Sequence, residues 1–247
     1  MSNNSKMGNI SSNIRGIIFD YGGTIDSRGV HWSWIIWDGY RQAQVPVTLE
    51  QFREAYVFAE RELAKVRHIL PCDNFLQLLR KKMTIELQYV AQQQWTDASQ
   101  QQLDEWSENI AQHCYRQAQD SIAEAIPVLE ALSQQYPLML VSNFYGNIDE
   151  VLRDLGIRHF FKGIIESAVV GIRKPNPTLF RLGVDALELP ADQVLVVGDS
   201  LKKDILPAHS LGCATAWMQG PGWTDDENSD ITIPTTTCRI TSLTQLL

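Results

Sequence analysis

The feature that most constrains the fold is a set of short apolar runs, each of which stops at a polar residue. The runs are Gly16–Phe19 before Asp20, Leu138–Val141 before Ser142, and Val194–Val197 before Gly198 and Asp199. Uninterrupted apolar runs of this length are typical of strands buried on both faces of a parallel sheet. Ligands bind where the carboxyl ends of such strands meet, so we expect these polar residues to gather at one edge of a sheet.

The segment between the first two runs has a helical pattern from about His31 to Gln117. Four amphipathic segments begin near His31, Thr48, Asp73 and Asp97, and Thr48 with Gln51 matches a helix capping box. Helices joined by short links indicate a small bundle. We therefore predict a helical cap domain at residues 27–119, inserted into a core made of residues 13–26 and 120–247.

Helix and strand patterns alternate after Asp120. The expected helices are Ile122–Gln135, Ile148–Leu155, Pro177–Leu187 and Lys202–Ser210, and the expected strands are Leu138–Val141, Gly163–Glu166, Val194–Val197 and Ala214–Met218. Such a series predicts an α/β fold, with a Rossmann-like, doubly wound parallel sheet and helices on both faces. Pro207 should kink or shorten the last helix. The pattern of Ile231–Leu247 predicts no definite element.

The composition limits the possible partners and compartment. A net charge of −8 over 247 residues argues against binding to nucleic acid or to an anionic membrane surface. No run of about 18 apolar residues predicts a membrane span, and the polar residues 1–12 predict a flexible tail rather than a secretory signal. The four widely spaced cysteines indicate free thiols in a reducing, cytoplasmic compartment. The oligomeric state is left open.

Four polar clusters follow one another in a fixed order. They are Asp20-Tyr21-Gly22-Gly23-Thr24, Ser142-Asn143, Arg173-Lys174-Pro175, and Gly198-Asp199-Ser200 with Asp204. In this order, over nearly the whole chain, they resemble the motifs of the haloacid dehalogenase superfamily. Its phosphatase-type members carry D-x-D-x-T/V, then Ser or Thr, then Lys, then G-D-x-x-x-x-D. The resemblance implies Mg²⁺-dependent hydrolysis of a small phosphorylated metabolite through an aspartyl-phosphate.

The resemblance also implies a role for each cluster. Asp20 would be the nucleophile, and Lys174 would neutralise it together with the transferred phosphoryl group. The Mg²⁺ ligands would be Asp20, the backbone carbonyl of Gly22, and Asp199. Asp204 would orient the water molecules of the metal without binding it directly. Phosphate oxygens would be bound by Ser142, Asn143 and Thr24.

Gly22 departs from the family pattern, because phosphatases have an Asp there that protonates the leaving oxygen and later activates water. Loss of such a group typically costs about 10²–10⁴ in rate. Three interpretations stay open. The leaving group needs no proton, as in acyl or aryl phosphates; another residue or a water replaces the acid, with Asp26 and His31 nearest in sequence; or the protein binds a phosphorylated ligand and turns it over poorly.

Two relatives in the superfamily also lack this Asp. Phosphonoacetaldehyde hydrolases have Ala there and a cap lysine that forms a Schiff base, which keeps carbon–phosphorus cleavage as an alternative. Lys65, Lys81 and Lys82 lie in the inserted segment, and we expect each to be a surface lysine. Haloacid dehalogenases lack the metal-binding fourth motif, so dehalogenation ranks below phosphoryl transfer here. The aromatic segment 31–37 is expected to form bundle core rather than a wall of the site.

Overall fold

The protein is built on a parallel sheet. The computed structural model describes residues 10–224 and 230–247, so positions 1–9 of the expected tail lie outside the described residues. The strands are β1 (Gly16–Phe19), β2 (Leu138–Ser142), β3 (Phe161–Glu166), β4 (Val194–Gly198), β5 (Ala214–Met218) and β6 (Cys238–Ile240). Within the described residues they form one sheet in the order β3-β2-β1-β4-β5-β6, and every pairing is parallel. The predicted α/β class is confirmed, and β6 lies in the tail whose short elements the sequence did not assign.

The register of the central strand brings the predicted site residues together. On β1, Phe19 pairs with Leu140 of β2 on one side and with Val197 of β4 on the other. Asp20, one residue further along, therefore lies close to the ends of both neighbouring strands, where Ser142 and Asp199 are found. The change of strand order on either side of β1 makes this edge the topological switch point of the sheet.

Helices cover both faces of the sheet. They are α1 (Trp32–Gln42), α2 (Leu49–Lys65), α3 (Phe75–Gln92), α4 (Gln100–Ser133), α5 (Ile148–Asp154), α6 (Ser167–Val170), α7 (Thr178–Leu187) and α8 (Leu206–Ser210). Ile18 and Val196 pack with the α7 residue Phe180 on one face. Ile17 and Leu140 belong to the larger core of the other face, with α4 and α5. Side chains alternate between the faces of a strand, so a doubly wound sheet buries both sets.

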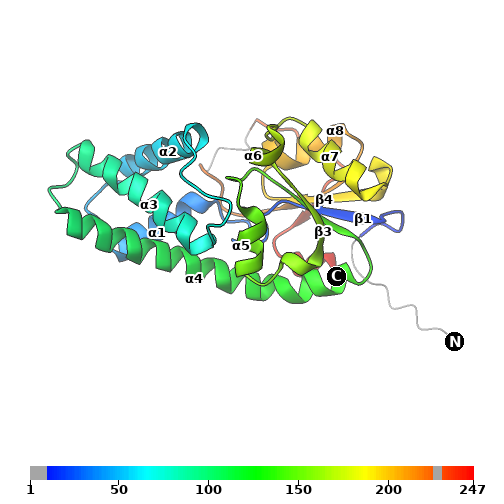
Figure 1. Ribbon diagram of the computed structural model, residues 1–247. Coiled ribbons are helices and arrows are strands. Elements are labelled where there is room, and N and C mark those ends of the chain that lie inside the picture. The colour runs from blue at the N-terminus through cyan, green and yellow to red at the C-terminus, as the bar shows by residue number, and fades with distance from the viewer. Residues whose placement is uncertain (1–9, 225–229) are drawn as a thin grey trace.

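Helices α1, α2 and α3 lie together beyond one end of the sheet, and α4 runs beneath both parts of the molecule (Figure 1). We predicted two helices here, starting near Asp97 and at Ile122, but the structure has one helix that begins after the N-cap Ser99. The polar residues near position 120 do not end it: the Ser121 hydroxyl is satisfied within the helix by the Gln117 carbonyl, and Ile122 and Ala125 continue its buried face. The predicted boundary at residues 119 and 120 thus falls inside α4, and the division into core and cap stays a prediction.

Several predicted helix ends also need correction. The capping box of Thr48 and Gln51 is confirmed. The N-cap of α3, however, is Asn74 rather than Asp73, whose carboxylate instead accepts hydrogen bonds from Lys81 and from the Leu70 N–H. Val66, at the C-cap just beyond the end of α2, is 47% exposed, although its spacing after Leu63 continues the helical apolar pattern of that segment.

The helix expected at Lys202–Ser210 is divided in two. A π-helical turn at Leu201–Ile205 leads into α8, and Pro207 lies in the first turn of α8. A proline in that position is tolerated because the first N–H groups of a helix have no partner within it. Pro207 therefore marks the start of a short helix rather than a kink in a longer one. None of the described helices combines the length and apolar content needed to cross a lipid bilayer.

Candidate active site

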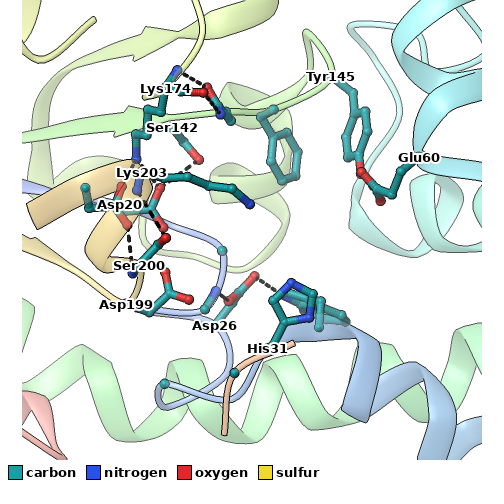
Figure 2. Close-up of a pocket in the computed structure, with 18 of the residues that line it drawn as sticks. Asp20, Asp26, His31, Glu60, Ser142, Tyr145, Lys174, Asp199, Ser200 and Lys203 are labelled. Atoms are coloured by element: carbon teal, nitrogen blue, oxygen red, sulfur yellow. Dashed lines mark hydrogen bonds and ion pairs between the residues drawn. The ribbon is translucent and has the colours of Figure 1, made fainter. Parts of the chain in front are cut away.

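A cavity of about 320 Å³ opens at the carboxyl edge of the sheet, between the strands and helices α1–α3 (Figure 2). The predicted residues that line it are Asp20, Gly22, Ser142, Asn143, Lys174, Asp199 and Asp204. A cavity of this size, closed on one side by helices from another part of the chain, suits a small metabolite. The structure therefore brings most of the predicted site residues into one chamber.

Asp20 lies at the centre of these residues. Its Oδ1 accepts hydrogen bonds from Lys174 Nζ at 2.6 Å and from the Ser142 hydroxyl at 3.3 Å. Burial raises the pKa of Asp20 to about 6, although the Lys174 ammonium opposes the rise. A carboxylate that is ionised at neutral pH but stripped of water is well suited to act as a nucleophile.

Lys174 is held rigidly between two carboxylates. Its Nζ lies 2.6 Å from Asp20 Oδ1 and 2.7 Å from Asp204 Oδ1, and its side chain is 2% exposed. Burial alone would lower the pKa of Lys174, but the two carboxylates more than offset this and raise it. The lysine, from the turn before α7, therefore supplies a fixed positive charge beside Asp20 and Asp204.

Asn143 is placed differently from its predicted role. Its side-chain Oδ1 accepts from the Lys174 N–H at 2.9 Å, and its Nδ2 donates to the Lys174 carbonyl at 3.2 Å. This pair of bonds fixes the turn that carries Lys174. The side-chain amide of Asn143 is thus already engaged with the backbone, which speaks against its predicted role in binding phosphate oxygens.

Thr24 lies beneath the carboxylates rather than beside the cavity. Its hydroxyl is 3.4 Å from Asp20 Oδ2 and 3.5 Å from Asp199 Oδ1, and the residue is fully buried. It is absent from the lining of the cavity. The structure therefore does not present Thr24 to a phosphate group as the sequence predicted. Its hydroxyl instead lies between Asp20 and Asp199, the two predicted carboxylate ligands of the metal.

The acidic residues form a set suited to a divalent cation. Carboxylate oxygens of Asp20, Asp199 and Asp204 lie within 4.8 Å of one another. Burial, and then the neighbouring carboxylates Asp204 and Asp20, raise the pKa of Asp199 well above its ordinary value. Such crowded hard oxygen donors, with one lysine among them, fit Mg²⁺, which prefers oxygen ligands. The residues of this chain therefore fit the predicted cation.

Each oxygen of Asp204 accepts a short hydrogen bond, whereas Asp20 Oδ2 and Asp199 Oδ1 are contacted by the Thr24 hydroxyl at 3.4 and 3.5 Å. Oδ1 accepts from Lys174, and Oδ2 accepts from the Ser200 N–H at 3.0 Å. Asp199 packs against Gly23, where a Cβ atom would lie 2.3 Å from Asp199 Oδ2 and where φ is +92°. Glycine is thus required at position 23 for both space and backbone conformation. This geometry favours Asp20 and Asp199 as direct ligands and Asp204 as a residue that positions its neighbours.

Gly22 leaves space that an acidic side chain could fill. A Cβ atom built at this position meets only Trp32 Cδ1, at 3.9 Å. The indole of Trp32 donates from Nε1 to Asp26 Oδ2 at 2.9 Å, and the Gly23 N–H donates to Asp26 Oδ1 at 2.8 Å. Asp26 is 1% exposed and lines the cavity, and burial raises its pKa to about 7. A second titratable carboxyl group therefore lies beside the position of the missing acid.

The cap side of the cavity carries charged residues that our sequence interpretation missed. Glu60 Oε1 on α2 accepts hydrogen bonds from Lys82 Nζ on α3 at 2.5 Å and from the Tyr145 hydroxyl at 2.9 Å. Figure 2 shows the side chains of Glu60 and Tyr145 side by side. Lys82 was expected at the surface, but it is 4% exposed. The sequence did carry a signal for this burial. Lys82 lies one helical turn after Leu78 and next to Met83, on the buried face of α3.

The aromatic segment at residues 31–37 is divided between the two roles considered for it. Ile36 belongs to the buried core, and Trp37 packs on Phe52 with ring centroids 5.2 Å apart. Trp32 and His31 line the cavity, and Ile36 both packs in the core and lines the cavity. The expectation that the segment is bundle core was therefore wrong for its first two residues.

Comparison with known proteins shows the family of the chain. The model of the haloacid dehalogenase-like hydrolase family matches residues 14–212. The glyceraldehyde 3-phosphate phosphatase of Methanocaldococcus jannaschii is 39% identical over 87 residues, which cover 34% of this chain and 38% of that protein. The phosphoserine phosphatase of Thermus thermophilus is 33% identical over 97 residues, 39% of each protein. These matched segments span less than half of either relative.

Solved structures share the fold over almost the whole chain. The HAD-hydrolase YfnB of Bacillus subtilis, bound to magnesium, superposes with a TM-score of 0.55 at 22% identity and covers 94% of this chain and 96% of that one. A dehalogenase with an intermediate complex superposes with a TM-score of 0.60 at 14% identity, covering 96% and 97% of the two chains. The family match over most of the chain, together with this fold, shows that the protein belongs to the haloacid dehalogenase-like hydrolases.

Proposed function

We propose that this hydrolase is a Mg²⁺-dependent phosphatase of small phosphorylated metabolites, acting through an aspartyl-phosphate on Asp20. The observation that carries the proposal is the meeting of Asp20, Lys174, Asp199 and Asp204 at one end of a small cavity. The relatives named as phosphatases of glyceraldehyde 3-phosphate and phosphoserine support this substrate class. The magnesium in the YfnB structure supports the choice of cation.

The residues gathered around Asp20 each have a part in the proposed reaction. A carboxylate oxygen of Asp20 attacks phosphorus and displaces the ester oxygen. Lys174 holds Asp20 ionised and offsets charge on the phosphoryl group, and the Ser142 hydroxyl is placed to turn from Asp20 toward a phosphoryl oxygen. Asp20, Asp199 and the Gly22 carbonyl would hold Mg²⁺, which supplies the positive charge that lets two anions approach.

The cavity and its charges fit a small anionic substrate. Arg173 and Lys203 line the same chamber as Lys174, so positive charge is concentrated there on a chain that is acidic overall. The volume of about 320 Å³ leaves space for a compact metabolite and not for a polymer. A macromolecular or membrane-bound substrate is accordingly no part of the proposal.

Phosphate release from a panel of small phosphomonoesters tests the proposal. With Mg²⁺ present, Asp20→Asn should lower turnover at least about 10³-fold, since the amide cannot act as the nucleophile. Asp104→Asn on the exposed side of α4 is the matched control and should leave turnover unchanged. Chelation of Mg²⁺ should abolish turnover. Unchanged hydrolysis by Asp20→Asn would refute the proposal.

A second candidate function is supported by Gly22, which removes the family acid from its usual place. In this case the protein would bind a phosphorylated ligand and turn it over poorly. Calorimetric binding of a phosphomonoester with Mg²⁺, without detectable phosphate release from any ester, would favour this alternative. Rapid release from even one small ester would eliminate it.

Carbon–phosphorus cleavage through a lysine Schiff base is less well supported. Burial alone would lower the pKa of Lys82, but the Glu60 carboxylate more than offsets this and raises it well above its ordinary value. An amine must be neutral to attack a carbonyl group. Lys65 and Lys81 do not line the cavity. Absence of a borohydride-trapped adduct on Lys82 with a phosphonate aldehyde would remove this alternative.

A further inference from the structure

We propose that Asp26 is the general acid and base of this site, and that it replaces the carboxyl group absent at Gly22. The inference rests on the proposed phosphatase function and assigns one of its catalytic residues. It also decides between Asp26 and His31, the two neighbouring residues that the sequence offered as replacements.

The position of Asp26 follows from two hydrogen bonds. Its Oδ1 accepts from the Gly23 N–H at 2.8 Å, and Gly23 is joined to Gly22 by one peptide bond. The Asp26 oxygen therefore lies within about 5.7 Å of Gly22 Cα, close to the region that an aspartate side chain at position 22 would reach. The loop therefore folds back so that the carboxyl group of Asp26, four residues after Gly22, lies near the place where a side chain at position 22 would carry its carboxyl group.

Trp32 completes the replacement. Its Cδ1 atom lies 3.9 Å from where the Cβ of residue 22 would be, and its Nε1 donates to Asp26 Oδ2 at 2.9 Å. The indole therefore borders the space beside Gly22 and holds the carboxyl group of Asp26 at the cavity wall. Figure 2 shows Asp26 in this position. Each carboxyl oxygen has two lone pairs, so Asp26 can accept both N–H bonds and still carry a proton for the substrate.

The environment of Asp26 suits a group that both gives and takes a proton. The side chain is 1% exposed, and burial holds its pKa at about 7 despite the two N–H donors. A general acid and base works best when its pKa is near the working pH. The group is therefore present in both protonation states under neutral conditions.

His31 also lines the cavity, but its Nδ1 is engaged at the start of α1. Its Nδ1 accepts from the Ser33 N–H at 3.2 Å as the N-cap of α1 and lies 2.8 Å from the Ser33 hydroxyl. Its ring packs against Tyr56 and Trp223, with centroids 6.1 and 5.4 Å away. This ring is thus part of the structure that begins the first cap helix, while Asp26 is held next to Gly22.

The proposed reaction has two steps, and one proton leaves Asp26 in the first and returns to it in the second. The Asp20 carboxylate forms a bond to phosphorus as the bond from phosphorus to the ester oxygen breaks, and the departing oxygen takes the proton of Asp26 to leave as an alcohol. Water then attacks the aspartyl-phosphate, transfers a proton to the Asp26 carboxylate, and releases inorganic phosphate. Both carboxyl groups return to their starting states.

The test compares leaving groups that need a proton with ones that do not. In Asp26→Asn, turnover of an alkyl phosphate such as propyl phosphate should fall about 10²–10⁴-fold, because an alkoxide leaves poorly without a proton. Turnover of 4-nitrophenyl phosphate should fall less than about 10-fold in its phosphorylation step. That step is read from the burst of nitrophenol in rapid-mixing experiments with Mg²⁺.

The double variant Gly22→Asp with Asp26→Asn keeps the test independent of folding. The space beside Gly22 accepts the new side chain, so alkyl phosphate turnover should recover at least about 10-fold over Asp26→Asn. An equal loss with both esters, no recovery in the double variant, or a wild-type enzyme inactive on every alkyl phosphate would overturn the assignment. If Asp20→Asn also leaves hydrolysis intact, the phosphatase function itself fails; if only the Asp26 results fail, that function stands.

Discussion

The two ends of the cavity each bury a lysine against carboxylates, yet their charge balances differ. The core cluster, made of Asp20, Lys174, Asp199 and Asp204, holds three carboxylates around one ammonium group. The cap cluster, made of Glu60, Lys82, Glu86 and Tyr145, pairs one carboxylate with one ammonium group.

Glu86 in the cap cluster does not change this balance, because burial raises its pKa to about 8 and leaves it mostly protonated at neutral pH. Asp20 and Asp204 alone outnumber the single Lys174 ammonium group, so the core cluster can accept a further cation, whereas the cap cluster is neutral by itself. Similar pairs of buried lysine and carboxylate can thus mark a reactive site in one place and a structural support in another. The number of uncompensated charges separates the two cases.

The largest expected effect is that of Lys174→Met. Removal of the ammonium leaves Asp20 and Asp204 buried without their partner, so turnover should fall at least roughly 10²–10³-fold. The free energy of unfolding without Mg²⁺ should fall by about 3–5 kcal/mol. Urea unfolding and phosphate release measure the two effects. Lys82→Met is the matched change in the cap cluster, and an equal loss of turnover there would contradict the difference between the clusters.

Magnesium should stabilise the core cluster alone. At a concentration of 100 times the dissociation constant, Mg²⁺ should add about 2.7 kcal/mol to the free energy of unfolding. Asp199→Asn should remove most of this gain, since it takes away one of the crowded oxygens. Glu60→Gln should retain it. Thermal unfolding with and without Mg²⁺ distinguishes these outcomes, and a gain lost equally in both variants would show that the cation is not held at the core cluster.

The buried Glu86 should make stability depend on pH. Its pKa is raised from an ordinary value of 4.5 to about 8 by burial, so the folded state binds the proton more tightly than the unfolded state. The contribution of protonated Glu86 to the free energy of unfolding is full below pH 4.5 and is lost as pH rises through about 8. Glu86→Gln should flatten that part of the profile by a few kcal/mol relative to wild type. Identical slopes for the two proteins between these pH values would contradict the expectation.

The smallest expected effect is that of Tyr145→Phe. The hydroxyl is one of two donors to Glu60 Oε1, and Lys82 stays in place, so stability should fall by about 1 kcal/mol. Turnover should change little because the core cluster is untouched. Equilibrium unfolding in urea gives the first quantity, and a large rate loss instead would assign the cap cluster a direct part in the reaction.

The core cluster could be predicted from the sequence because strand ends locate its residues. Asp20, Ser142 and Asp199 each follow an apolar run, and parallel pairing places such ends side by side. The sequence did not show that Thr24 lies below the carboxylates or that Asn143 binds the Lys174 backbone. Both contacts depend on the conformation of a loop, which the periodicity of apolar residues in the sequence does not predict.

The cap cluster was harder to predict because it depends on packing between helices. A helical period indicates which residues share a face, but not which face meets another helix or how that helix is rotated. Lys82 and Glu60 lie on different helices, and the third partner, Tyr145, comes from a loop after β2. Three separate segments must be positioned before these residues can meet.

The length of helix α4 affects how the protein unfolds. Its 34 residues span about 51 Å, and it buries Leu103 and Ile110 near one end and Ile122 and Leu129 towards the other. Fraying at either end of α4 removes packing from the whole helix. Neither the sheet nor helices α1–α3 should therefore unfold while the other stays folded. Native-state hydrogen exchange should therefore show the amides at the middle of α4 opening only in the global, cooperative unfolding event.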